Sequence, residues 1–198
     1  MWHEIIPILV MMNPIGLFLY LYPIRQELSR HDFIKVLTKA TLISFVILVA
    51  FFFSGNFLFE KVFQINFESF RIFGGIVIFS FSYMFIVKGQ KAFIHMKENL
   101  DDLAAEIALP FMVGAGTLSL TILLSHNVSN FNGVFYLFIA SLMAFLIIIL
   151  LNIFRDKIPK EKWRIAFDKN MEVLLRLNGF FIGAIGVNMV ITGILAVI

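Results

Sequence analysis

Two short stretches carry residue types that could hold a polar ligand, and the first is Asn13-Pro14-Ile15-Gly16. Asn is favoured at a helix N-cap and Pro at the first helical position after it, so this pair predicts that a new helix begins here. Proline also lacks an N–H and keeps the preceding residue out of the α region. Gly16 has no side chain, so we expect another group to approach its backbone closely.

The second stretch is Gly114-Ala115-Gly116-Thr117, which follows a proline at position 110. Its two glycines permit a positive φ or an extended kink, and Thr117 or Ser119 could cap the helix that follows. We therefore predict a second helix break. For each break taken singly, the alternative is a structural one: a proline kink for the first, and close helix packing for the second.

Both breaks lie inside long uncharged segments, residues 5–24 and 107–154. A new helix N-terminus carries about half a positive charge and unpaired N–H groups, which suit a carboxylate. No Asp, Glu, Lys or Arg lies at a predicted midplane, so a small zwitterion suits the site better than a ligand with net charge. We predict that the ligand is bound by Asn13, Pro14, Gly16, Gly114, Gly116 and Thr117, with Ser119 and Asn188 as secondary candidates.

Other small or acidic residues in these segments favour structural roles. Gly179, Gly183 and Gly186 form a stripe that includes a GxxxG spacing, which is typical of close helix contacts in membranes. Glu4 and Glu106 lie near the starts of predicted helices, where the helix dipole favours acidic residues.

The elements that must position the two breaks are membrane-spanning helices. Hydrophobic residues make up 60% of the chain and charged residues 15%, whereas soluble domains average about 45–50% apolar residues. The uncharged run 107–154 exceeds the roughly 20 residues of one span and contains a polar stretch, so it divides in two. We predict an all-α polytopic membrane protein whose first and fourth helices are discontinuous, with spans at residues 4–23, 34–59, 67–87, 106–124, 134–154 and 173–197.

The distribution of basic residues predicts the orientation of these helices. The regions after the first, third and fifth spans hold 14 of the 16 Lys and Arg residues. Such regions face the cytoplasm, so both termini are expected outside. We expect an uncleaved, multi-pass protein of the cytoplasmic (inner) membrane, in contact with the lipid bilayer. A nucleic-acid partner is not expected, because the basic residues are spread over three regions.

The two halves of the chain resemble each other weakly. Arg71 and Arg176 each precede a glycine by three residues at the start of the third helix of a triplet, and the two breaks occupy corresponding positions. Because each half holds an odd number of helices, the second copy enters the membrane from the opposite side. We predict inverted repeats at residues 1–97 and 98–198 of a single membrane domain. The alternative is chance similarity between apolar helices.

Several classes of chemistry find no support in the sequence. The chain has no cysteine, and its four histidines show no HxxxH or HExxH spacing, so we expect no disulfide, metal or other cofactor. Ser125 and His126 are adjacent in a predicted loop, which does not suit a Ser–His catalytic pair. We therefore do not expect an enzyme.

Three segments together resemble the MarC family, also called the neutral amino acid transporter family. They are MMNPIGLFLYLYPI in the first span, LPFMVGAGTLSLTI in the fourth and RLNGFFIGAIGVNMVITGI in the sixth. The resemblance covers nearly the whole chain. It implies a six-helix inner-membrane protein with inverted three-helix repeats that transports small neutral amino acids such as glycine and alanine.

The leading hypothesis from the sequence is a secondary transporter of small zwitterionic amino acids that works by alternating access. Its coupling ion, a proton or Na⁺, is left open. A passive channel or an exporter for another small solute is the alternative, because the same broken helices could line a pore. An assembly factor that uses the GxxxG stripe is a further alternative, and a homo-oligomer is left open.

Overall fold

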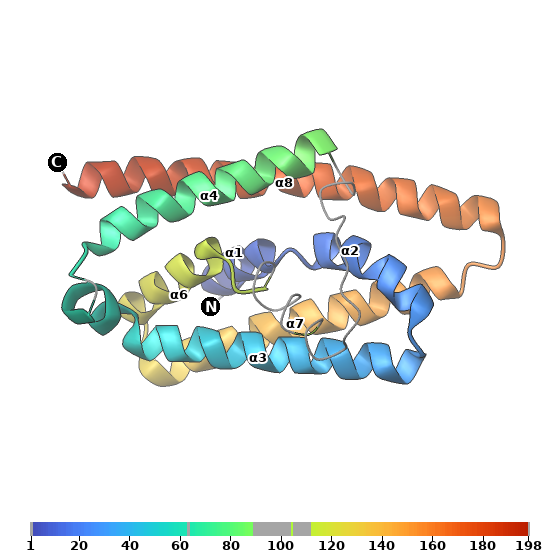
Figure 1. Cartoon of the computed structure of the whole chain (residues 1–198), viewed down its shortest axis with the longest axis horizontal. Helices are drawn as coiled ribbons and strands as arrows, with labels where there is room; N and C mark the ends of the chain where they lie inside the picture. Colours follow the sequence, from blue (N-terminus) through green and yellow to red (C-terminus); the bar gives the residue numbers. More distant parts are fainter. Residues whose placement is uncertain (1, 63, 89–103, 105–111, 198) are drawn as a thin grey trace.

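The computed structural model describes residues 2–62, 64–88, 104 and 112–197. The described chain forms a bundle of α-helices and one π-helical turn, so the predicted all-α class is confirmed for this part of the chain. The elements, with the numbering of Figure 1, are α1 (Trp2–Met12), α2 (Pro14–Glu27), α3 (Arg30–Phe57), the π-turn η1 (Leu58–Val62), α4 (Phe67–Lys88), α6 (Ala115–Asn127), α7 (Asn130–Asp156) and α8 (Glu161–Val197).

In the part of the chain that the structure describes, five stretches are long and apolar enough to cross a membrane, and they correspond to five of the six predicted spans. The first runs from Trp2 to Leu19 and includes the junction of α1 with α2, and the others lie in α3, α4, α7 and α8. The remaining predicted span, 106–124, is described only from Met112 onward, with α6 as its second half. Glu106 and Pro110 lie outside the described residues.

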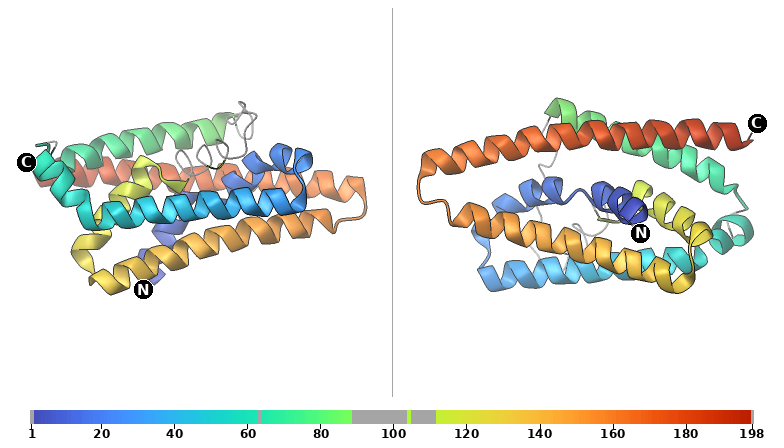
Figure 2. Two further views of the ribbon diagram at one scale, coloured as in Figure 1. Left: turned by 60° about the horizontal axis from the view of Figure 1, so that its bottom comes forward. Right: turned by 180° about the vertical axis from the view of Figure 1, so that it is seen from behind.

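The helices form three layers (Figures 1 and 2). Helices α4 and α8 lie side by side in one outer layer, and α3 and α7 form the other. The middle layer consists of α1, α2 and α6, which are the helices next to the two predicted breaks. Within this arrangement α1 packs on α7, and α6 packs on α3 and α4. The middle layer is therefore covered on both faces.

Glycines allow the close contact between α4 and α8. A Cβ atom on Gly186 would lie 2.8 Å from the Gly75 carbonyl oxygen, and a Cβ on Gly75 would lie 2.6 Å from the Gly186 carbonyl oxygen. The Ser82 hydroxyl of α4 donates a hydrogen bond to the Gly179 carbonyl oxygen at 2.7 Å. The packing role that the sequence predicts for the glycine stripe of α8 is confirmed, because only hydrogen atoms fit between these backbones.

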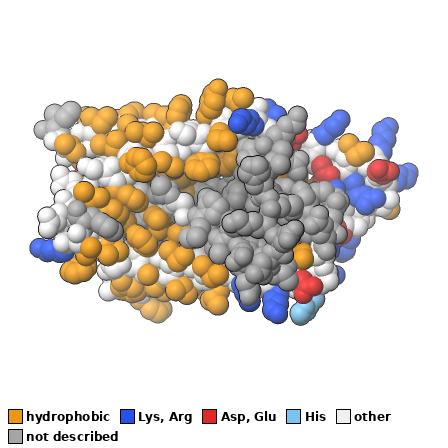
Figure 3. All heavy atoms as spheres, viewed as in Figure 1, with side chains coloured by type: hydrophobic (Ala, Val, Ile, Leu, Met, Phe, Trp, Pro, Cys, Tyr) orange, Lys and Arg blue, Asp and Glu red, His pale blue; other side chains and the backbone are white. Residues whose placement is uncertain are grey.

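Large apolar side chains divide between the interior and the outer surface. Ile8, Leu37 and Leu137 belong to a core between the middle layer and the α3–α7 layer, and Phe18 and Phe85 belong to a second core beneath α4 and α8. Hydrophobic side chains also cover much of the face in Figure 3, whereas most Lys and Arg side chains gather at the end where α7 turns into α8. This distribution suits a bundle that is surrounded by lipid along most of its length.

The N-terminus of α8 differs from the prediction. The sequence predicts a helix from residue 173, but α8 begins at Glu161 and contains 37 residues. At 1.5 Å per residue such a helix measures about 55 Å, well beyond the roughly 30 Å of hydrocarbon. Its polar first turns are held on α7 by Arg155, whose guanidinium donates to both carboxylate oxygens of Asp168 at 2.6 and 2.7 Å. Hydropathy marks the apolar segment, whereas tertiary contacts extend the helix beyond it.

The connection between α6 and α7 is also shorter than predicted. The sequence predicts a polar loop at 125–133, but α6 continues to Asn127 and α7 begins at Asn130, with Ser129 at its N-cap. Polar residues in this stretch therefore belong to helix ends. Asn and Ser suit both loops and helix caps, so residue type alone does not distinguish the two.

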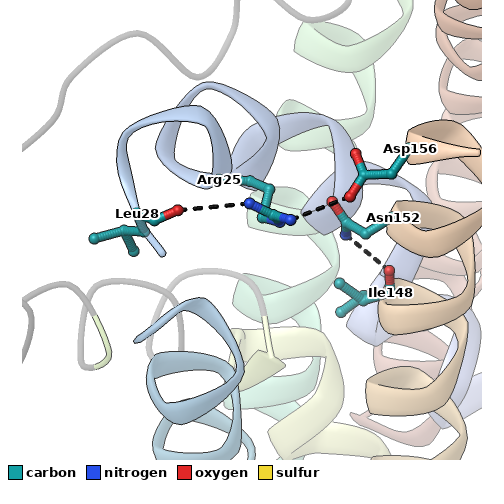
Figure 4. Close-up of polar contacts among 5 residues, drawn as sticks. All are labelled: Arg25, Leu28, Ile148, Asn152 and Asp156. Carbon is teal, nitrogen blue, oxygen red and sulfur yellow. Dashed lines mark hydrogen bonds and ion pairs between the residues drawn. The ribbon is translucent and has the colours of Figure 1, made fainter. Parts of the chain in front are cut away.

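Polar contacts join α2 to α7 at the end of the bundle where α7 turns into α8 (Figure 4). The Arg25 guanidinium lies 3.1 Å from an Asp156 carboxylate oxygen and makes a longer, 3.5 Å contact with the Leu28 carbonyl oxygen. The buried Asn152 donates to the Ile148 carbonyl oxygen one turn back on α7 at 2.8 Å. The contact between Arg25 and Asp156 holds the C-terminus of α2 on α7.

Candidate ligand-binding site at two helix breaks

The first predicted break is confirmed between α1 and α2. Asn13 has a φ of 49°, in the left-handed region that Asn adopts more readily than most residues, and Pro14 is the first residue of α2. The Asn13 carbonyl oxygen accepts from the Leu17 N–H at 2.9 Å, and its side-chain Oδ1 accepts from the Gly16 N–H at 2.9 Å. Asn13 therefore caps α2 with both its backbone and its side chain.

The contacts of Gly16 explain why a glycine occupies this position. A Cβ atom on Gly16 would lie 2.8 Å from Cγ and 2.9 Å from Oδ1 of Asn13. The group that approaches its backbone is thus the side chain of Asn13. The structure places neither Gly16 nor Pro14 among the residues that line the cavity described below.

The second break differs in detail from the prediction. Gly114 is the N-cap of α6, and its φ of −86° and ψ of 170° are extended, so of the two predicted geometries this glycine adopts the extended one. Within the described residues, no side-chain hydrogen bond caps this helix. Thr117 lies in the first turn, and its hydroxyl donates to the Gly114 carbonyl oxygen at 2.9 Å. The prediction that Thr117 or Ser119 caps the helix is therefore wrong, and the first N–H groups of α6 have no acceptor within the helix.

A cavity of about 60 Å³ lies where the two breaks meet α4 and α8. A water molecule needs about 10–15 Å³ of such a cavity, so the space holds roughly four to six groups of the size of a water molecule. Four of the predicted site residues line it: Asn13, Gly114, Gly116 and Thr117. Apolar side chains form the remaining wall: Met11, Val77, Ile78, Phe81, Phe85 and Ile182. Positions about 100 residues apart thus meet at one site, as the matched breaks predict.

The side-chain amide of Asn13 is the main polar group of the cavity. Its Oδ1 accepts two hydrogen bonds, from the Gly16 N–H at 2.9 Å and from Nδ2 of Asn178 at 2.8 Å. Its Nδ2 is buried and has no acceptor in the described part of the chain, although the residue is only 3% exposed. A buried amide N–H without an acceptor is unfavourable, so this atom is poised to donate to a ligand.

Asn178 is a site residue that the sequence did not indicate. It lies on α8 within a segment that also contains Asn188, and nothing in the local pattern separates the two asparagines. The helical phase of α8 decides between them, because Asn178 faces the middle layer while Asn188 is exposed. In the sequence Asn178 directly precedes Gly179 of the glycine stripe, but the direction in which its side chain faces depends on how α8 packs.

The electrostatics of the cavity come from helix ends. The N-terminus of α6 brings N–H groups that have no acceptor within the helix, and a partial positive charge, to Gly116 and Thr117, which line the cavity. Met11, in the last turn of α1, also lines it, so the carbonyl end of α1 brings partial negative charge to the same place. None of the described lining residues is ionisable. The site thus offers both signs of partial charge without a formal charge.

The two secondary candidates lie elsewhere. Ser119 is 2% exposed, and its hydroxyl has no hydrogen-bond partner in the described structure, but the residue is not among those that line the cavity. Asn188 is exposed on α8, and its carbonyl oxygen accepts from the Thr192 hydroxyl at 2.7 Å. Neither residue is brought to the cavity.

Comparison with known proteins gives consistent matches over the length of the chain. A family profile described as "MarC family integral membrane protein" matches residues 1–198. The chain is 28% identical to a UPF0056 membrane protein of Pyrococcus horikoshii, over 93% of this chain and 88% of that protein. It is 25% identical to the UPF0056 membrane protein YvbG of Bacillus subtilis, over 97% and 92% of the two chains. No solved structure matches.

Proposed function

This chain belongs to the MarC family of integral membrane proteins, and from that membership we propose that it is a secondary transporter of small neutral amino acids of the glycine and alanine class. The observation that carries the proposal is the cavity between two helix breaks, where the buried Nδ2 of Asn13 has no acceptor among the residues that the structure describes. Intramembrane helix breaks of this kind are a recurrent way of building substrate sites in secondary transporters.

The polar groups around the cavity suit a zwitterion. A carboxylate could accept from Asn13 Nδ2 and from the first N–H groups of α6, while an ammonium group could donate toward the carbonyl end of α1. The volume matches roughly four to six water-sized groups, about the number of non-hydrogen atoms in glycine or alanine. The apolar wall of Ile78, Phe85 and Ile182 would accept a hydrogen or methyl side chain and disfavour a charged one.

The helix contacts support inverted repeats and alternating access. The first helix of repeat one, α1, packs against α7, which is the second helix of repeat two. Reciprocally, α6 belongs to the first helix of repeat two and packs against α3, the second helix of repeat one. The third helices of the two halves, α4 and α8, pair with each other. Such reciprocal contacts are expected for repeats at 1–97 and 98–198. Movement of the α4–α8 layer across the middle layer would open the cavity to one side of the membrane at a time.

Uptake by purified protein in liposomes tests this proposal. Labelled glycine and alanine are supplied under a proton gradient, under a Na⁺ gradient and without a gradient, and empty liposomes serve as the control. Saturable uptake with accelerated counterflow is expected, and dependence on one gradient identifies the coupling ion. Absence of saturable uptake of either amino acid under every gradient would overturn the proposal, and saturable flux without counterflow would favour the channel alternative.

The same proposal includes the location and orientation of the protein. We place it in the cytoplasmic membrane with the α7–α8 turn in the cytoplasm, because Lys and Arg residues concentrate at that end.

A further inference from the structure

Asn178 joins the outer α4–α8 layer to the first helix break. It lies 165 residues from Asn13 in the sequence, and its Nδ2 donates to Asn13 Oδ1 at 2.8 Å. The same oxygen accepts from the Gly16 N–H at 2.9 Å. An amide oxygen has two lone pairs, so these two donors occupy its accepting capacity.

This pair of donors fixes the orientation of the Asn13 amide. If the amide were rotated by half a turn, its NH₂ group would face the Gly16 N–H and the Asn178 NH₂, and donors would oppose donors. Of the polar atoms of this amide, only Nδ2 has no hydrogen-bond partner among the described residues, and Asn13 lines the cavity. The amide therefore offers the ligand a hydrogen-bond donor, and its acceptor is already used.

We propose that Asn178 is a positioning residue that sets the polarity of this site and thereby its preference for ligands with a carboxylate. The inference rests on the proposed function and names the atom that selects the charged oxygen of the substrate. With Asn178 in place, Asn13 Nδ2 and the N–H groups of α6 act together as donors. Without it, Oδ1 keeps a single donor and the amide is less firmly oriented.

Binding of two probes to purified full-length protein in lipid nanodiscs tests the proposal. Glycine carries a carboxylate, and glycinamide carries an uncharged amide in its place, so the ratio of their dissociation constants reports the polarity of the site. Asn178→Leu removes the donor at similar size, and Asn178→Gln retains it. Asn188→Leu is the matched control, because Asn188 lies on the same helix but is exposed.

We expect Asn178→Leu to reduce the preference for glycine over glycinamide about tenfold, since charge-assisted hydrogen bonds are the stronger ones. Asn178→Gln should recover most of that preference, and Asn188→Leu should leave it unchanged. A purely structural role would weaken both probes equally. An unchanged ratio in a folded Asn178→Leu protein would overturn the inference.

A second measurement separates this inference from the proposed function. In protein labelled with ¹⁵N-asparagine, the Asn13 side-chain NH₂ signal is identified by its loss in Asn13→Asp. Asn178→Leu should shift this signal and speed its hydrogen exchange, whereas Asn188→Leu should not. If the wild type binds neither probe, the proposed function fails, and the NMR result still decides whether Asn178 orients Asn13. An unaltered Asn13 signal would refute that role.

Discussion

Replacing Gly16 with alanine tests the account of the first break most directly. On helix propensity alone, alanine should stabilise α2 by about 1 kcal/mol. The structure predicts the opposite, because the new Cβ would lie 2.8 Å from Cγ and 2.9 Å from Oδ1 of Asn13. The Asn13 side chain would have to move and would lose its hydrogen bonds with the Gly16 N–H and with Asn178.

The expected size of the effect follows from these contacts. Overpacking in a tightly packed interior costs about 1–3 kcal/mol, and each displaced hydrogen bond costs about 0.5–1.5 kcal/mol. The gain in helix propensity offsets about 1 kcal/mol of these costs. Gly16→Ala should therefore lower the free energy of unfolding by about 3 kcal/mol in total. Reversible unfolding in mixed micelles titrated with SDS and followed by circular dichroism measures this change.

A double-mutant cycle isolates the cause. Asn13→Gly removes the side chain that the new methyl group would strike, and glycine tolerates the φ of 49° at this position. In this background Gly16→Ala should be neutral or stabilising by about 1 kcal/mol. The reasoning is refuted if Gly16→Ala costs the same in both backgrounds, or if it costs nothing in the wild type.

Three further predictions address other parts of the molecule. Asp168→Asn should lower the free energy of unfolding by about 2 kcal/mol in the same assay, because Arg155, only 8% exposed, loses its bidentate carboxylate partner. A change near zero would mean that other contacts of Arg155 are enough to stabilise its buried charge. Thr117→Val should raise the KM for glycine uptake about fivefold, whereas Thr117→Ser should keep a KM near that of the wild type. The reason is that the Thr117 hydroxyl hydrogen-bonds within the first turn of α6, which lines the cavity. Equal KM values for the two variants would exclude a role of the hydroxyl. Because the chain has no cysteine, Ser129→Cys and Lys160→Cys each provide a single site for labelling. An impermeant maleimide should react at position 129 in intact cells, but at position 160 only after permeabilisation. The reverse pattern would mean that the proposed topology is inverted.

Hydropathy and the distribution of charge predicted much of the fold but misplaced helix ends. Five predicted spans correspond to long apolar helices, because about 20 uncharged apolar residues suffice to identify a spanning segment. The start of α8 at Glu161 was not predictable in this way, since its first turns are polar and are stabilised by the pairing of Asp168 with Arg155 of α7. Hydropathy measures the transfer of residues into lipid, and a helix can continue beyond the lipid when a neighbouring helix binds it.

The first helix break was determined by the sequence itself. Proline has no N–H and restricts the residue before it, asparagine tolerates the left-handed region and caps the next helix, and all of these properties act within four residues. The structure accordingly shows Asn13 at a φ of 49° with Pro14 at the start of α2. The position of the second break was predictable in the same way from its glycines, although the choice between a positive φ and the observed extended geometry was not.

Only the tertiary structure decided which atoms of the breaks face a ligand. Asn13 Oδ1 accepts from Asn178, 165 residues away, and in the described part of the chain its Nδ2 is a donor without an acceptor. Gly16 lies against Asn13 and does not line the cavity, while Asn188 is exposed because of the helical phase of α8. A residue's type and its neighbours in the chain determine the local backbone, whereas the partner of a side chain depends on which helices pack together and at what rotation.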